Sequence, residues 1–259
     1  MSASSPIGVF DSGVGGLSIL KALRAALPFE DFVYLADTGY APYGERGDAY
    51  VIQRTRAIVQ RLRDEYAIKA LVLACNTATA AAIDLARQEH PGLPTVGVEP
   101  ALKPAVALSR TRRIGVLATR GTLAGAKLRA LHDALKEQAE FVLQPCDGLA
   151  DAIENQDGPR VAALCARYAQ ALGEFGPQAG QIDTVVLGCT HYAFAQEELA
   201  AVAGPAVRLV ETGEPVARQT RRLLEAAGQL RPAGAGRVRL LSTGSLPALQ
   251  SAAARWLGL

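Results

Sequence analysis

Short apolar runs alternate with amphipathic stretches along nearly the whole chain. In the first part, the apolar runs cover residues 7–10, 32–36, 71–74 and 95–98. They are rich in aliphatic and β-branched residues without polar alternation, which is typical of strands buried on both faces of a parallel sheet. The stretches between them have helical spacing, and the helices they predict cover residues 17–27, 48–66 and 77–88. A sheet with helices on both faces is therefore expected.

The same alternation restarts at residue 113, after a break at Pro100 and Pro104. The expected strands of this second part cover residues 114–117, 141–143, 184–187, 207–210 and 238–241. The expected helices cover residues 123–135, 149–154, 159–172, 196–202 and 215–227. The break predicts a boundary between two α/β units within residues 99–111. The expected fold class is therefore α/β, with two parallel sheets.

Composition and charge exclude several classes of partner. The chain has 259 residues, of which 49% are hydrophobic, so it can bury a sizeable core. Its formal net charge is only +2, and the short basic run at residues 110–113 has the pattern of a solvated loop, so we expect no nucleic-acid partner. No apolar stretch approaches the ~20 residues that cross a bilayer, so we expect no membrane association.

The cysteines and the N-terminus indicate the cellular compartment. The first residues lack the charged and apolar regions of a signal peptide. The four cysteines are too few and too scattered for a disulfide framework: they are Cys75, Cys146, Cys165 and Cys189. Reduced thiols in the cytoplasm are therefore expected. Cys165 lies on an apolar helix face, so we expect it in the core. We expect no functional role for Cys146.

The other two cysteines lie in matching settings. Each follows an apolar run and precedes polar residues: Cys75 stands before Asn76 and Thr77, and Cys189 stands before Thr190 and His191. A helix N-terminus at such a position favours the thiolate. Two equivalent acid/base thiols suit the inversion of a stereocentre, where one group removes a proton from one face of a carbon and another protonates the opposite face. The alternative is a pair of buried structural cysteines.

Other thiol chemistries fit this spacing less well. A zinc site takes three or four ligands, commonly with close Cys-x-x-Cys pairs, whereas Cys189 and His191 supply two at an unusual spacing. We therefore expect no metal, and no cofactor is indicated either. A cysteine hydrolase uses one nucleophile with one base and would leave the second thiol idle. His191 is close enough in sequence to Cys189 to exchange a proton with it.

Polar residues follow other expected strands of the first part, where ligands of parallel sheets collect. Asp11 and Ser12 open a glycine-rich turn whose N–H groups attract an anion. Asp11 is either a ligand of a substrate ammonium, a partner of a thiol or a helix cap. Asp37 begins a Gly/Pro-rich loop, in which the backbone amides of Tyr43 and Gly44 either bind a carboxylate or belong to a rigid surface turn.

The second part offers three further candidates. Thr119 and Thr122 stand at an expected helix entrance, where hydroxyls are most often N-caps. They are alternatively ligands for the distal carboxylate of an acidic substrate. Glu154 is either a solvated surface residue or a partner of His191.

Together these residues resemble the glutamate racemases, amino-acid racemases of the PLP-independent aspartate/glutamate racemase family. The similar segments are Phe-Asp-Ser-Gly-Val-Gly-Gly-Leu at 10–17, Asp37 with Pro-Tyr-Gly at 42–44, Ala-Cys-Asn-Thr at 74–77, Gly-Val-Glu-Pro at 97–100, Ile-Gly-Val at 114–116 with Thr119 and Thr122, and Leu-Gly-Cys-Thr-His-Tyr at 187–192. They extend over about residues 7–214 and are specific in combination.

The resemblance implies an architecture and a reaction. The architecture is two pseudo-symmetric Rossmann-like α/β domains with the active site in the cleft between them. Because the second domain is inserted into the first, the expected domains are residues 1–98 with 210–259, and residues 99–209. The reaction is the cofactor-independent interconversion of L- and D-glutamate, which supplies D-glutamate for peptidoglycan synthesis. A homodimer is one expected assembly.

The resemblance also implies roles for individual residues. Cys75 and Cys189 are the acid/base thiols, and Asp11, His191 and Glu154 assist them. The residues expected to bind the amino acid are Asp11, Ser12, Tyr43, Gly44, Asn76, Thr77, Thr119, Thr122, Thr190 and His191.

Two rival functions stay open at this point. Aspartate racemases are similar but usually carry Glu after the second Cys-Thr, so His191 favours glutamate. A non-catalytic binding protein, for instance one acting on DNA gyrase, is not supported by the near-neutral charge balance. The chain also departs from the family in two places. Glu211 stands where relatives usually have Asp, and residues 143–149 differ from the Cys-Pro-Leu stretch of relatives, which bears on the role of Glu154.

Overall fold

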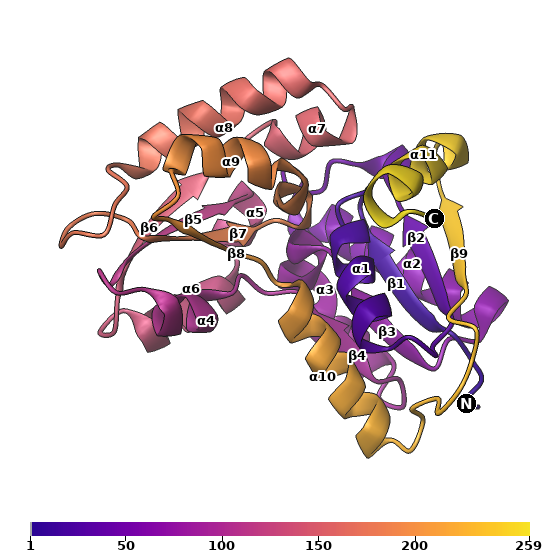
Figure 1. The fold of residues 1–259 in the computed structure, drawn as a ribbon. Helices are drawn as coiled ribbons and strands as arrows, with labels where there is room; N and C mark the ends of the chain where they lie inside the picture. Colours follow the sequence, from indigo (N-terminus) through magenta and orange to yellow (C-terminus); the bar gives the residue numbers. More distant parts are fainter. Residues whose placement is uncertain (1) are drawn as a thin grey trace. The chain divides into compact units, whose positions relative to one another are not determined.

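The computed structural model describes residues 2–259, which form two compact units (Figure 1). One unit consists of the chain up to Val98 together with Gly213–Leu259, and the other of Glu99–Thr212. Each contains one sheet whose paired strands are all parallel, so the predicted α/β class is confirmed. The predicted domain limits differ from these units at residues 210–212. Val210 belongs to the core of the second unit, and Glu211 accepts a hydrogen bond from Gln196 there.

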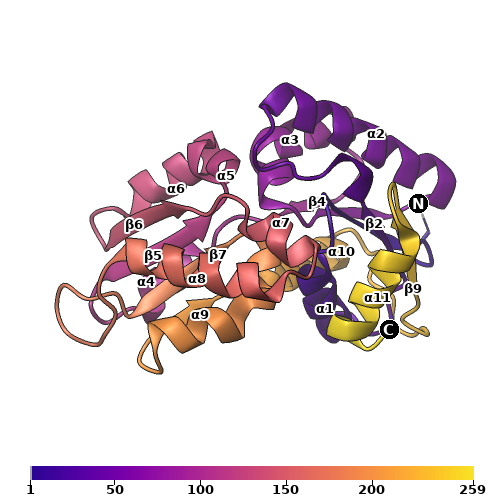
Figure 2. The ribbon, with the colours of Figure 1, turned by 90° about the horizontal axis from the view of Figure 1, so that it is seen from above.

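The sheet of the first unit has the strand order β4-β3-β1-β2-β9. Its strands are β1 (Ile7–Asp11), β2 (Phe32–Ala36), β3 (Ala70–Leu73), β4 (Thr95–Gly97) and β9 (Val238–Ser242). One face is covered by α2 (Asp48–Tyr66) and α3 (Asn76–Glu89), and the other by α1 (Leu17–Ala26), α10 (Gly213–Ala226) and α11 (Leu246–Leu257) (Figure 2). Because the strands are parallel, the residues that follow them share one edge of the sheet. The short 3₁₀ helix η1 (Thr38–Tyr40) begins there.

The sheet of the second unit has the order β6-β5-β7-β8. Its strands are β5 (Arg113–Ala118), β6 (Glu140–Pro145), β7 (Thr184–Gly188) and β8 (Arg208–Val210). Its helices are α4 (Leu102–Leu108), α5 (Arg120–Ala124), α6 (Ala126–Leu135), α7 (Leu149–Glu154), α8 (Gly158–Leu172) and α9 (Gln196–Ala203), with the 3₁₀ helix η2 (Thr190–Ala195) between β7 and α9. Within this unit, α8 and α9 lie on one side of the sheet and α4 and α6 on the other (Figure 1).

Two sequence-based predictions are wrong in detail, each for a local reason. Pro104 does not interrupt the pattern but lies in the first turn of α4, where a proline costs no intrahelical hydrogen bond. The single helix predicted over residues 123–135 is two helices, α5 and α6. Gly125 separates them because its backbone is extended, with φ −66° and ψ 140°.

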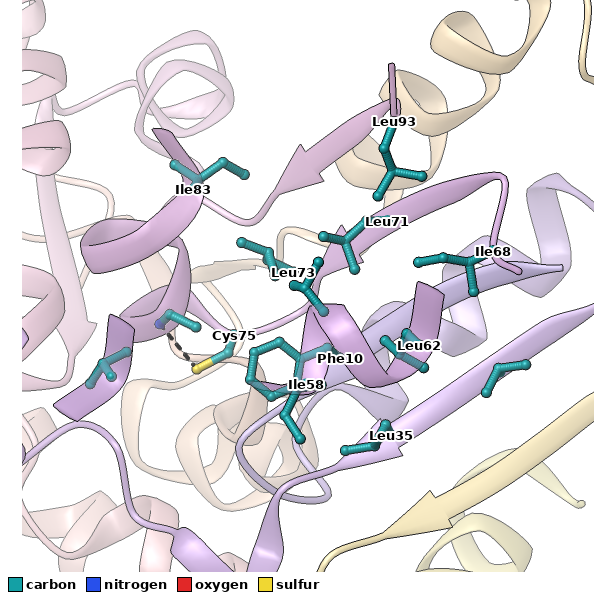
Figure 3. Packing of buried hydrophobic residues seen from close by; sticks show 14 of the residues in the cluster. Phe10, Leu35, Ile58, Leu62, Ile68, Leu71, Leu73, Cys75, Ile83 and Leu93 are labelled. Atoms are coloured by element: carbon teal, nitrogen blue, oxygen red, sulfur yellow. Dashed lines mark hydrogen bonds between the residues drawn. The ribbon is translucent and has the colours of Figure 1, made fainter. Parts of the chain in front are cut away.

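The core of the first unit lies between its sheet and the pair α2 and α3. Aliphatic side chains from β2 and β3 and the Phe10 ring of β1 pack there with Ile58 and Leu62 of α2, as Figure 3 shows. Cys75 and Phe10 lie together at one end of this cluster. The core therefore fixes the strand end that carries the thiol.

A buried ion pair joins four separated segments of the first unit. Lys69 and Glu30 are 0% and 1% exposed, and Nζ of Lys69 lies 2.6 Å from Oε2 of Glu30. The same ammonium donates to the carbonyl oxygens of Ala3 and Gln229, at 2.6 and 2.8 Å. Oε1 of Glu30 accepts the backbone N–H of Arg231 at 2.8 Å. The pair thus fastens the returning C-terminal segment to the N-terminal strands.

Candidate active site

Cys75 lies where β3 turns into α3. It is the N-cap residue of α3, and its Sγ accepts a hydrogen bond from the backbone N–H of Ala78 at 3.4 Å, drawn as the dashed line in Figure 3. The residue is 6% exposed. An N–H group and a helix N-terminus directed at sulfur stabilise the thiolate relative to the thiol. Cys75 is therefore placed to act as a base.

Asp11 and Ser12 follow β1, the strand that pairs with β3. The Ser12 hydroxyl accepts from Sγ of Cys75 at 3.7 Å and donates to Oδ1 of Asp11 at 3.4 Å. Oδ1 of the fully buried Asp11 also accepts the N–H of Gly13 at 2.7 Å. The helix-cap interpretation of Asp11 is wrong, because Gly16 is the N-cap of α1. Asp11 instead holds the turn after β1 and is connected through Ser12 to the thiol.

The turn between β1 and α1 leaves room only for glycine at position 16. A Cβ atom on Gly16 would lie 2.6 Å from Cβ of Asp11 and 3.1 Å from Cβ of Ala74. The Tyr34 hydroxyl donates to the carbonyl oxygen of Gly13 at 2.7 Å, which closes the turn from the side of β2. The turn that carries Asp11 is therefore held by close packing at Gly16 and by a hydrogen bond from β2.

The loop after β2 is organised around the fully buried carboxylate of Asp37. Arg54 of α2 donates to both of its oxygens, from Nε to Oδ2 and from Nη2 to Oδ1, each at 2.9 Å. The hydroxyls of Tyr43 and Thr243 donate to the same group, the second at 2.8 Å. Burial, together with the bond to Asp37, raises the pKa of Tyr43, so its hydroxyl stays protonated. That hydroxyl is therefore committed to Asp37.

Cys189 occupies the corresponding place in the second unit, after β7. It is the N-cap residue of η2 and is 8% exposed. Its Sγ lies 3.8 Å from Nδ1 of His191, and Nε2 of His191 lies 2.7 Å from Oε2 of Glu154. The side chains of His191 and Glu154 are 8% and 21% exposed. The structure thus connects Cys189 to His191 and His191 to Glu154. The interpretation of Glu154 as a solvated surface residue is therefore wrong.

The imidazole of His191 is held in its charged form by its two neighbours. Burial alone would lower its pKa, but hydrogen bonds to Cys189 and Glu154 and the charges of both groups outweigh burial and raise the pKa well above 6.5. A protonated imidazole can donate a proton to a neighbouring group. The two thiols therefore have different supports: a backbone N–H and a hydroxyl for Cys75, and an imidazolium–carboxylate pair for Cys189.

Two buried tyrosines hold the segment that leads into α7, the helix that carries Glu154. The hydroxyl of Tyr192, next in the chain to His191, donates to the carbonyl oxygen of Cys146 at 3.3 Å. The hydroxyl of Tyr168 on α8 donates to the carbonyl oxygen of Asp147 at 2.6 Å. These bonds hold the segment just before α7 in place.

The remaining hydroxyl and amide candidates lie at helix starts. Thr119 is the N-cap of α5 and accepts the N–H of Thr122 at 3.2 Å, so its predicted capping role is confirmed. Asn76 and Thr77 open α3 after Cys75, and Nδ2 of Asn76 donates to the carbonyl oxygen of Val98 at 3.3 Å. Thr190 opens η2 after Cys189 and is buried. In each unit these groups stand at the same sheet edge as the thiol.

The four cysteines are free thiols, and burial raises the pKa of two of them, Cys146 and Cys165. Cys165 is fully buried on α8, and burial raises its pKa to about 12. Cys146 follows β6, its Sγ contacts the carbonyl oxygen of Gln144 at 3.4 Å, and burial raises its pKa as well. Both are therefore held as neutral thiols. The prediction that Cys165 is a core residue is confirmed.

Sequence reasoning missed two residues of the first unit, Arg54 and Thr243. Arg54 lies in the middle of α2, where the sequence pattern predicts that a charged residue faces solvent. Thr243 directly follows β9, the last strand along the chain. Of these two residues, only Thr243 could have been predicted from the sequence. It directly follows an expected strand, and ligands of parallel sheets bind at the carboxyl ends of the strands. Within residues 2–259, no group of three or more His, Cys, Asp or Glu side chains is arranged to hold a metal ion. None of the helices described combines the length and apolar character needed to cross a membrane.

Comparison with known proteins gives one consistent set of relatives. A family model described as Asp/Glu/Hydantoin racemase matches residues 7–220. A glutamate racemase of Methylococcus capsulatus is 50% identical over 227 residues, which is 87% of this chain and 81% of that protein. The crystal structure of the glutamate racemase isoform RacE1 from Bacillus anthracis is similar with a TM-score of 0.86 and 32% identity, and covers 98% of this chain and 94% of the other. The glutamate racemase of Francisella tularensis, solved in complex with D-glutamate, gives a TM-score of 0.83 at 27% identity, with 99% and 95% covered.

Proposed function

The chain belongs to the Asp/Glu/hydantoin racemase family, and we propose that it interconverts L- and D-glutamate without a cofactor, using Cys75 and Cys189 as its two acid/base groups. One observation carries the proposal. In each unit an inner strand, β3 or β7, ends in a free and nearly buried cysteine that is the N-cap of the following helix. A hydrolase or a structural pair would not need two such equivalent positions.

The reaction moves one proton off the α-carbon and another onto it. One cysteine, as thiolate, takes the α-proton; the S–H bond forms as the C–H bond breaks, and the electron pair passes into the α-carboxylate. The other cysteine, as thiol, gives its proton to the opposite face of the same carbon. After one turnover the protonation states of the two cysteines are exchanged, so the enzyme is ready for the reverse direction.

The carbanion-like intermediate needs donors at its carboxylate, since no electron sink takes part. We assign this role to the hydroxyls of Ser12, Thr77 and Thr190. The backbone N–H groups of Tyr43 and Gly44 hold a substrate carboxylate equally well in the bound substrate and in the intermediate, so they contribute to substrate binding. Thr119 and Thr122 are assigned to the distal carboxylate of the substrate. Asn76 completes the set of polar groups that bind the amino acid. Preorganised donors in a site with little water stabilise developing negative charge far better than water does. Asp11 is the candidate for the substrate ammonium and for the support of Cys75 through Ser12.

The two thiols are activated differently. For Cys75, the N–H of Ala78 and the N-terminus of α3 lower the cost of the thiolate. For Cys189, the charged His191 plays that part, and Glu154 keeps the imidazole charged. The two half-reactions therefore depend on different residues, although they use the same chemistry.

Cysteine replacements test this function. Cys75→Ala and Cys189→Ala are each expected to lower the racemisation rate by about 10²–10⁴-fold, since each removes a general acid/base. Circular dichroism of the product follows the activity, and the far-ultraviolet spectrum checks the fold. Cys165→Ala is the matched control and should stay active, because Cys165 lies in the core of the second unit. Full activity of either Cys75→Ala or Cys189→Ala would overturn the two-thiol mechanism.

Two further properties follow from the same proposal. Four free thiols fit a reducing compartment, so we place the protein in the cytoplasm, where D-glutamate would enter peptidoglycan synthesis. On the family resemblance, we take a homodimer as its assembly. Light scattering on the purified protein tests this, because one chain has a mass of 27.2 kDa.

A further inference from the structure

The turn after β9 is fastened to the loop after β2 by a network that the proposed reaction does not use directly. The Thr243 hydroxyl donates to Oδ1 of Asp37 at 2.8 Å and accepts the backbone N–H of Gly39 at 3.2 Å. The donor of this hydroxyl and one of its acceptor positions are thus used by the segment 37–39. The backbone N–H of Thr243 donates in turn to the carbonyl oxygen of Ala36 at 3.1 Å.

The two segments are also packed too closely to move independently. A Cβ atom on Gly39 would lie 2.8 Å from the carbonyl oxygen of Thr243, and one on Gly244 would lie 2.6 Å from Oγ1 of Thr38. The hydroxyls of Thr38 and Ser242 are hydrogen-bonded at 2.7 Å. Only glycines at 39 and 244 allow this approach of the two backbones.

Asp37 connects Thr243 to Tyr43, because its carboxylate accepts hydrogen bonds from both hydroxyls. Its carboxylate accepts the Tyr43 hydroxyl, and the ring of Tyr43 packs edge-on against Phe10 at 6.2 Å between centroids. Arg54 fixes the carboxylate from the other side, and its guanidinium stacks 3.4 Å from the centre of the Tyr40 ring. The loop is therefore held at both of its tyrosines, and the backbone at 43 and 44 has little freedom.

We propose that Thr243 and Arg54 are positioning residues, which set the backbone N–H groups of Tyr43 and Gly44 for the substrate carboxylate through the shared partner Asp37. The inference rests on the proposed glutamate racemisation, and it assigns part of substrate binding to the C-terminal return segment. Neither residue needs to touch the substrate. Their effect is on binding, because the loop supplies donors to a carboxylate and no proton to the α-carbon.

Valine at position 243 gives the sharpest test. Thr243→Val keeps the shape of the side chain but removes the donor to Asp37 and the acceptor for Gly39. The expected result is a KM for glutamate raised by about tenfold, the fold-change for one lost hydrogen bond to a charged group, with kcat changed by less than about threefold. Thr243→Ser restores the hydroxyl and should restore KM. Thr220→Val is the matched control, because that buried hydroxyl donates to the Val216 carbonyl oxygen of its own helix, at 2.8 Å, and lies outside the segments joined by Asp37.

Each outcome decides the matter. A raised KM in Thr243→Val that Thr243→Ser rescues supports the proposal, whereas a Thr243→Val enzyme with the KM of Thr220→Val overturns it. A loss confined to kcat overturns it as well. If Thr243→Val does not fold, Arg54→Lys replaces it, since lysine cannot make the bidentate contact; a raised KM then supports the proposal and an unchanged KM overturns it. A wild-type enzyme without glutamate racemisation refutes the proposed function and this inference with it. An active wild type with an unaffected Thr243→Val refutes the inference alone.

Discussion

Replacement of Glu154 by glutamine isolates the ion pair that keeps His191 charged. Glu154→Gln keeps the size and the hydrogen-bonding oxygen of the side chain and removes only the negative charge. Because the 2.7 Å contact joins two largely buried groups, removal of the negative charge from it should cost about 1.5–3 kcal/mol of unfolding free energy where His191 is protonated. The pKa of His191 should fall, since burial opposes the charged form and one of the groups that favour it is gone.

The sign of the pH dependence follows from the direction of that pKa. In the wild type the pKa of folded His191 lies above its unfolded value, so the pair contributes its full stability below about pH 6.5. The contribution is lost as pH rises through the raised pKa of the folded state. The difference in unfolding free energy between wild type and Glu154→Gln should therefore be larger at pH 6 than at pH 9.

The assay is urea unfolding across this pH range, analysed by linear extrapolation. Asp151→Asn is the matched control: it makes the same change on the same helix, but the pair of Asp151 with Arg160 is 40% and 47% exposed. Such an exposed pair contributes about 0–1 kcal/mol, so the control should show a small loss. A Glu154→Gln loss that is the same at pH 6 and pH 9, or no larger than that of Asp151→Asn, would refute the argument that buried charge at Glu154 holds His191 protonated.

Three further predictions concern stability and thiol reactivity. Burial alone would raise the pKa of Asp183, but the four hydrogen bonds that its carboxylate accepts outweigh burial and lower this pKa to about 2. Asp183→Asn should therefore destabilise the protein by about 1–2 kcal/mol at pH 7. Calorimetry should find that this difference vanishes as the pH falls through about 2. Lys69→Met leaves the carboxylate of Glu30 buried without its ammonium and should cost about 3–5 kcal/mol in urea unfolding; a loss below about 1 kcal/mol would contradict the buried pairing. Cys165 should resist alkylation in the folded protein at pH 8 and react in urea, as mass spectrometry of labelled peptides can show; rapid labelling without urea would mean that burial does not protect this thiol.

The alternation of apolar runs and amphipathic stretches was sufficient to predict the fold class and most of the elements. It succeeded because strands buried on both faces, such as β2, have a continuous apolar composition. The predictions from this pattern were wrong where a single residue overrides the hydrophobic periodicity. Pro104 is accommodated in a first helical turn, Gly125 breaks a helix that the periodicity joins, and α11 was overlooked although Ser245 caps it.

The candidate site shows a similar division. Residues directly after strands, such as Cys75 and Cys189, were identifiable because parallel topology collects strand ends at one edge. The contact of Glu154 with His191 was not derivable, since it depends on how α7 packs beside η2 and on the tyrosines that hold it. Arg54 and Thr243 were missed for the same reason: their partner Asp37 is far from both in sequence.

The most direct test of the two-thiol mechanism is the incubation of the enzyme with L-glutamate in D₂O, followed by measurement of α-deuterium in each enantiomer at early times. With one thiol on each face of the α-carbon, the D-glutamate that forms carries deuterium from the second thiol, while the remaining L-glutamate keeps its proton. We predict this asymmetric labelling, and its loss in Cys75→Ala and Cys189→Ala. Equal deuterium in both enantiomers would indicate a single base, and glutamate that gains no deuterium at all would contradict racemisation itself.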